Sequence, residues 1–102
     1  MRRRAKIDAN QPDIVSALRK AGVSVKSLAP MGDGYPDLLV GKYGRNWLFE
    51  VKDPAKPKSK RALTTDERAF HAEWLGQIAT IETAEEALAM IFEDSKRYGE
   101  KR

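Results

Sequence analysis

The feature that most constrains the fold of this chain is a pair of apolar runs separated by Tyr43-Gly44. The runs cover residues 37–40, which read DLLV, and residues 46–53, which read NWLFEVKD. A two-residue turn between antiparallel strands is favoured when glycine takes its second central position. We therefore expect these runs to form a β-hairpin with Tyr43-Gly44 at its tip.

This turn would also fix which residues face one another. Lys42 would lie opposite Arg45, and counting back along both strands brings Asp37 opposite Glu50. Residues directly opposite one another point to the same face, with their Cβ atoms about 4.5–5.5 Å apart. A longer loop would shift this register, so the pairing depends on the turn.

Alternation along the second strand adds a third polar residue to this face. Glu50 and Lys52 are two residues apart and share a face, whereas Val51 points to the other face. Two carboxylates this close raise each other's pKa unless a cation joins them. A divalent cation such as Mg²⁺ takes oxygen ligands and keeps waters for a phosphate substrate. The alternative is an ordinary ion pair of Lys52 with Glu50 or Asp37 on a solvated sheet face.

The remaining patterns predict a helix over residues 11–21, a strand over 23–28, a glycine-rich loop over 31–36 and a strand over 78–81. Two further helices begin at capping-box patterns, Thr64–Glu67 and Thr83–Glu86. The order is α-β-β-β-α-β-α, an α/β domain. In the last helix we expect an apolar side formed by Ala84, Leu88, Ile91 and Phe92.

Length and composition limit the class of protein. The 102 residues make one domain, 41% apolar and 33% charged, without cysteine. Neither a signal peptide nor a membrane-spanning run is present in the sequence. These features suggest an intracellular, cytoplasmic protein.

The net charge of +4 is unevenly distributed. Residues 2–6 carry four positive charges and residues 52–61 carry a net +4, so the rest of the chain is acidic. Two such clusters favour a polyanionic partner, although they can also serve only solubility. We expect a basic arm over residues 1–9 and a mobile basic loop over residues 53–62. The candidate DNA-phosphate contacts are Arg2, Arg3, Arg4, Lys6, Lys56, Lys58, Lys60 and Arg61.

The segment GYPDLLV, residues 34–40, followed by Glu50-Val51-Lys52, resembles the PD-(D/E)XK nuclease motif. The surrounding pattern is similar to the VRR-NUC branch of that superfamily over residues 10–91. This resemblance implies a restriction-endonuclease-like core, in which a central mixed sheet is flanked by helices.

The resemblance also implies an Mg²⁺- or Mn²⁺-dependent DNA endonuclease. Asp37 and Glu50 would be metal ligands, together with the backbone carbonyl of Val51. Lys52 would be the catalytic lysine that assists a water activated by the metal, and the products would carry a 5′-phosphate and a 3′-hydroxyl. Short stand-alone members look like Holliday-junction resolvases of phages and bacteria, which implies a homodimer acting on branched DNA such as junctions or flaps.

Two positions depart from the family pattern. Gln11 stands where the first helix usually has glutamate, and Glu67 stands where the family usually has glutamine. Glu67 could supply the missing acid through a metal-bound water, while Gln11 binds that water or the phosphate. Alternatively, Glu67 only closes its capping box and Gln11 only starts a helix. A branched-DNA-binding module that has lost cleavage is the rival function.

The remaining candidates are weaker. Phe70 and Trp74, four residues apart, suit a core or dimer contact better than a base-stacking platform. His71 suits a surface or interface position better than a catalytic one. Gly32 and Gly34 could admit a phosphate to the backbone or only form the turn into the strand.

Overall fold

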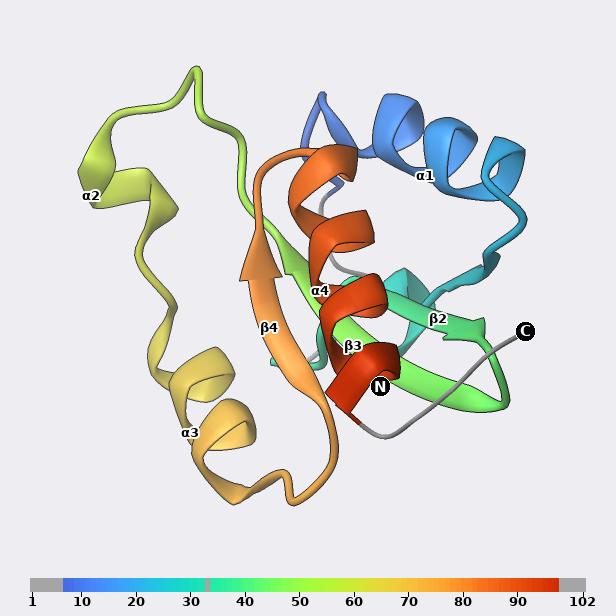
Figure 1. The fold of residues 1–102 in the computed structure, drawn as a ribbon. Helices are drawn as coiled ribbons and strands as arrows, with labels where there is room; N and C mark the ends of the chain where they lie inside the picture. Colours follow the sequence, from blue (N-terminus) through green and yellow to red (C-terminus); the bar gives the residue numbers. More distant parts are fainter. Residues whose placement is uncertain (1–6, 33, 98–102) are drawn as a thin grey trace.

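The computed structural model describes residues 7–32 and 34–97, and it confirms a mixed α/β class with a four-stranded sheet flanked by helices (Figure 1). The helices are α1 (Gln11–Lys20), α2 (Lys58–Arg61), α3 (Thr65–Glu73) and α4 (Ala84–Arg97), with a short 3-10 helix η1 (Ala29–Met31). The strands are β1 (Ser24–Ser27), β2 (Leu38–Lys42), β3 (Arg45–Val51) and β4 (Ile78–Ile81).

The strands lie in the order β1-β2-β3-β4. The first three are antiparallel neighbours, and β4 runs parallel to β3. A parallel pair needs a crossover connection, which here contains α2 and α3 (Figure 1). This connection carries the basic loop and α3 away from the hairpin and then returns to it.

The predicted hairpin register is confirmed. Lys42 pairs with Arg45 and Leu38 pairs with Phe49, so Asp37 and Glu50 follow as the next opposed positions. Tyr43 and Gly44 have φ values of 55° and 74°. Positive φ at both central residues is the conformation of the tight two-residue turn that suits the twist of the strands.

One face of the sheet carries the hydrophobic core. The alternate residues Trp47, Phe49 and Val51 of β3 are buried there among apolar side chains of α1 and α4. The Trp47 indole N–H also donates a 2.6 Å hydrogen bond to Asp94 of α4. The side chains of Leu48 and Glu50 therefore point to the opposite face of β3, as does that of Lys52 just beyond the strand.

Both capping boxes are confirmed. Thr64 accepts a hydrogen bond from the Glu67 backbone N–H, and the Glu67 carboxylate accepts one from the Thr64 backbone N–H. Thr83 and Glu86 make the same reciprocal pair at α4. Each box satisfies N–H groups that the first turn of a helix leaves without partners.

Two expectations about packing need correction. Phe92 is 45% exposed, whereas Ala84 and Ile91 are buried as expected and Leu88 packs against the core. Trp74 is also exposed and α3 buries no residue, so the Phe70–Trp74 pair does not enter the core, and the alternative of a dimer contact stays a prediction. Residues 58–61 of the basic loop form the single turn of α2, and the mobility of the loop stays a prediction.

In the part of the chain that the structure describes, none of the helices has the length and apolar character of a membrane span.

Candidate functional site

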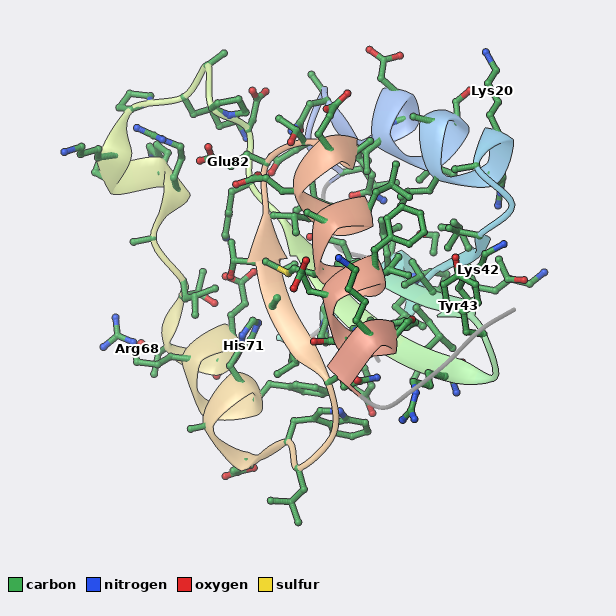
Figure 2. All side chains as sticks on the ribbon, viewed as in Figure 1. Lys20, Lys42, Tyr43, Arg68, His71 and Glu82 are labelled. Atoms are coloured by element: carbon green, nitrogen blue, oxygen red, sulfur yellow. The ribbon has the colours of Figure 1, made fainter. Side chains whose placement is uncertain are left out.

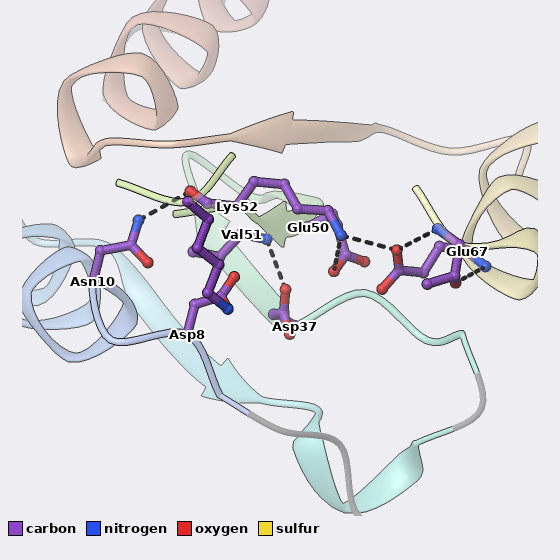
Figure 3. Close-up of polar contacts among 9 residues, drawn as sticks. Asp8, Asn10, Asp37, Glu50, Val51, Lys52 and Glu67 are labelled. Atoms are coloured by element: carbon purple, nitrogen blue, oxygen red, sulfur yellow. Dashed lines mark hydrogen bonds and ion pairs between the residues drawn. The ribbon is translucent and has the colours of Figure 1, made fainter. Parts of the chain in front are cut away.

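A polar pocket of about 220 Å³ opens on the face of β3 opposite the core (Figure 3). The hairpin register brings Asp37 and Glu50 into it from neighbouring strands, and Val51 and Lys52 follow at the end of β3. The other lining residues come from the segment before α1, the glycine loop, the basic loop and α3: Asp8, Gly32, Gly34, Tyr35, Lys60 and Glu67.

Asp37 is fixed at the end of the hairpin by the backbone of the opposite strand. The Val51 N–H donates a 2.7 Å hydrogen bond to Asp37 Oδ2. Burial raises the pKa of Asp37, although hydrogen bonds from Glu50 and from the Val51 N–H act in the opposite direction. Asp37 is therefore held in place by the backbone N–H of the residue that follows Glu50.

Glu50 is the more deeply buried of the two carboxyls, with 3% of its surface exposed. Burial, the hydrogen bond to Asp37 and the charge of Asp37 together raise the pKa of Glu50 to about 10. Among the described residues, Glu50 Oε1 has no hydrogen-bond partner. An orphaned, buried carboxyl oxygen is costly to the fold and is typical of a group held ready for a ligand.

Lys52 extends along the same pocket and is held by Glu67. Its Nζ lies 3.0 Å from Glu67 Oε1 and 3.9 Å from Glu50 Oε2. Burial alone would raise the pKa of Glu67, but the Thr64 N–H and the Lys52 ammonium outweigh burial, and the pKa is lowered. Glu67 thus closes its capping box and pairs with Lys52 at the same time, and its role as the missing acid stays a prediction.

Asp8 is a lining residue that the sequence patterns did not single out. It lies within the segment expected to be a basic arm, three residues before α1, and its negative charge acts to raise the pKa of Asp37. Asp8 Oδ1 is 2.6 Å from the Lys56 Nζ. Only the folded chain brings these residues together, 48 positions apart, so no local spacing could have revealed the contact.

Gln11 does not line the pocket, contrary to the suggestion that it binds a metal-bound water or the phosphate there. It begins α1, where its buried side chain lines a separate cavity with Ile7, Val15 and Ser27.

Asn10, one residue earlier, connects α1 to the sheet. Its amide donates to the carbonyls of Lys52 and Glu82, at 3.0 and 3.1 Å, and ties the start of α1 to the ends of β3 and β4.

The predicted phosphate contacts divide into three groups. Lys60 lines the pocket, whereas Lys58 is exposed outside it. Lys56 and Arg61 are engaged in ion pairs, the former with Asp8 at 2.6 Å and the latter with Glu82 at 3.1 Å. Arg2, Arg3, Arg4 and Lys6 of the N-terminal arm lie outside the described residues.

Gly34 packs against α3 as well as lining the pocket, whereas His71 lies outside the pocket. Gly34 has a φ of 82°, and a Cβ there would come within 2.7 Å of Asp66 Cβ, so this glycine lets α3 pack against the loop. His71 is half-buried on the side of α3 that faces β4 (Figure 2). Burial lowers the pKa of His71. It does not line the pocket, in keeping with its expected non-catalytic role.

The donor set of the pocket fits one hard divalent cation. Asp37 and Glu50 offer carboxylate oxygens beside Val51, and one Glu50 oxygen has no hydrogen-bond partner in the described part of the chain. Within residues 7–32 and 34–97, no set of three or more acidic or histidine side chains has the arrangement of a metal site. A site with two carboxylates suits Mg²⁺, which is commonly held by one or two carboxylates, with waters and substrate phosphates as its other ligands.

Comparison with protein-family models, with curated proteins and with solved structures finds no match to this chain.

Proposed function

We propose that this protein is a metal-dependent, structure-selective DNA endonuclease that hydrolyses phosphodiester bonds in branched DNA. The observation that carries the proposal is the convergence of Asp37, Glu50 and Lys52 in one pocket, with a Glu50 oxygen that no described residue hydrogen-bonds. We infer that the four-stranded sheet and its helices form a restriction-endonuclease-like core.

Asp37, Glu50 and the Val51 carbonyl would hold Mg²⁺ or Mn²⁺. When bound, such an ion supplies positive charge that stabilises the transition state of phosphodiester hydrolysis. Glu50 must lose its proton to bind it, and removal of the repulsion between the carboxylates favours that loss.

Lys52 supplies the second positive charge. Its ammonium can donate hydrogen bonds to the attacking water and to a phosphate oxygen, and it balances the negative charge that develops there. The Glu67 carboxylate fixes the position of this ammonium. Lys60, also at the pocket, adds a contact for a neighbouring phosphate.

The alternative is a DNA-binding module of the same fold without cleavage activity. The placement of Gln11 favours it, because α1 then contributes no ligand to the pocket. The two functions share the basic loop and differ only in chemistry.

A cleavage panel tests the proposal. The protein is incubated with labelled four-way-junction, flap and linear duplex DNA, with Mn²⁺ or with EDTA. We expect metal-dependent nicking of branched DNA that is lost in Asp37→Asn and kept in Asp13→Asn, a carboxylate exposed on α1 outside the pocket. Binding of branched DNA without any product would support the module instead.

The homodimer implied by the resemblance would bring two such pockets to the two strands of a junction. It stays a prediction, which sedimentation velocity with and without junction DNA would check.

A further inference from the structure

Three aromatic side chains form a row that starts at the pocket. The Tyr35 and Phe70 rings are 5.2 Å apart between centroids and tilted by 52°. Phe70 and Trp74 are 5.4 Å apart and nearly parallel, at 19°. Tyr35 lines the pocket itself, two residues before Asp37. The row therefore connects the carboxylate site to the far end of α3.

The two ends of this row face solvent. Tyr35 is 40% exposed and Trp74 is 47% exposed, whereas Phe70 between them is partly buried. Leu75, next to Trp74, is fully exposed. Large rings gathered on one surface, rather than scattered singly, are a common sign of a binding site.

The exposed indole is held in place before any ligand arrives. The Phe70 ring stacks on one face of the Trp74 indole. On its edge, the indole Nε1 is so close to Gly76 that a Cβ at position 76 would come within 2.8 Å of this nitrogen. Gly76 thus leaves room for the edge of the ring. A fixed aromatic surface loses little conformational entropy when it binds a flat ligand.

We propose that Tyr35 and Trp74 stack on unpaired bases of the DNA strand whose phosphate enters the pocket. This inference rests on the proposed function and defines its substrate as a strand with unpaired nucleotides, such as a flap or an open junction. Continuity carries it: Tyr35 belongs both to the row and to the pocket, so a nucleotide whose phosphate lies near Asp37 can place its base on the aromatic surface. Base–aromatic stacking accepts any sequence, because every base has a flat face.

Two tryptophans in different surroundings make the test direct. Trp47 is buried and hydrogen-bonded to Asp94, whereas Trp74 is exposed. We titrate the protein with single-stranded oligothymidylate in EDTA, so that no cleavage is needed. Stacking should quench the Trp74 emission, and the quenching should disappear in Trp74→Leu, which keeps Trp47.

Affinity for the same labelled oligonucleotide, measured by fluorescence anisotropy, supplies the second readout. We expect Trp74→Leu and Tyr35→Leu each to weaken binding about 5–100-fold, and Trp74→Phe to restore most of it. The matched control is Phe92→Leu, which removes an exposed ring on α4 that contacts Tyr43 instead. Leu75→Ala tests whether any exposed apolar group has the same effect. Both controls should bind as wild type does, and circular dichroism checks that each variant is folded.

Equal affinity of wild type and folded Trp74→Leu would overturn the inference. A dimer contact at this surface would also overturn it. In that case the Trp74 emission would change with protein concentration in the absence of DNA, and Trp74→Leu would dissociate the dimer. Failure of the proposed function looks different: oligothymidylate would still quench Trp74, but no branched DNA would be cleaved in Mn²⁺.

Discussion

Glu50 holds its proton at neutral pH in the metal-free protein because burial and Asp37 both oppose its ionisation. The folded chain therefore binds this proton more tightly than the unfolded chain, in which the ordinary pKa is 4.5. The contribution of proton binding at Glu50 to the free energy of unfolding is therefore fully present below about pH 4.5 and is lost as the pH rises towards 10. The site is thus maintained at a cost in stability, as expected of a functional carboxyl.

This reasoning predicts that Glu50→Gln stabilises the protein in EDTA at high pH. The amide needs no proton, so the free energy of unfolding should exceed that of wild type at pH 8, by at most about 5 kcal/mol. The difference should shrink towards pH 4.5. Urea unfolding at several pH values measures it, with the exposed Glu85→Gln as the control. A variant that is less stable than wild type at pH 8 would contradict the assigned protonation of Glu50.

The contact of Glu67 with Lys52 can be separated from its contact with Thr64 by one substitution. Glu67→Gln keeps the capping box, because glutamine serves there as well as glutamate, but it removes the negative charge that faces Lys52. We expect kcat for branched DNA to fall about 10–100-fold, with little change in KM or helix content. The matched control is Glu86→Gln, the same substitution in the capping box of α4, whose Glu86 pairs with no lysine of the described residues. Cleavage at the wild-type rate would limit Glu67 to its role as a cap.

At the scale of elements, the hairpin was predictable because its information is local. The turn residues fix the register, the register opposes Asp37 and Glu50, and alternation adds Lys52. The two capping boxes are equally local. Asp8 was not predictable, since its place depends on the loop that carries Lys56 back to it. The spacing of Phe70 and Trp74 showed that they share a helix face, but not that this face meets solvent.

The hairpin tip offers a test of that local control. Gly44 has a positive φ, so Gly44→Ala should cost about 1–2 kcal/mol of stability through backbone strain alone. Asparagine tolerates this conformation better, so Gly44→Asn should lose less. Thermal unfolding of both variants measures the difference. If alanine and asparagine were equally tolerated, the left-handed turn would not be what holds the register.

At the scale of the whole molecule, opposite charges meet at the pocket. Lys60 of the basic loop lines the same cavity as the acidic side chains of the hairpin. A polyanion would be attracted by the loop, while a cation at the carboxylates would remove their repulsion of phosphate. Metal and DNA should therefore favour each other's binding.

The basic loop predicts salt-dependent binding of DNA. The logarithm of the association constant should fall linearly with the logarithm of salt concentration, and Lys60→Ala should reduce the magnitude of that slope by about 1. Lys20, at the far end of α1 from the loop (Figure 2), supplies the control Lys20→Ala. Anisotropy titrations with junction DNA in Ca²⁺ measure both slopes. An unchanged slope in Lys60→Ala would show that this lysine does not contact phosphate.

The most direct test of the carboxylate pair is Mn²⁺ binding to the free protein, measured by isothermal titration calorimetry at pH 8. We expect one site in wild type, unchanged affinity in Asp13→Asn, and at least a tenfold loss in Asp37→Asn. Affinity should also weaken as the pH falls, because protons compete for Glu50. If wild type binds no Mn²⁺, or if Asp37→Asn binds it equally well, Asp37 and Glu50 do not share a cation.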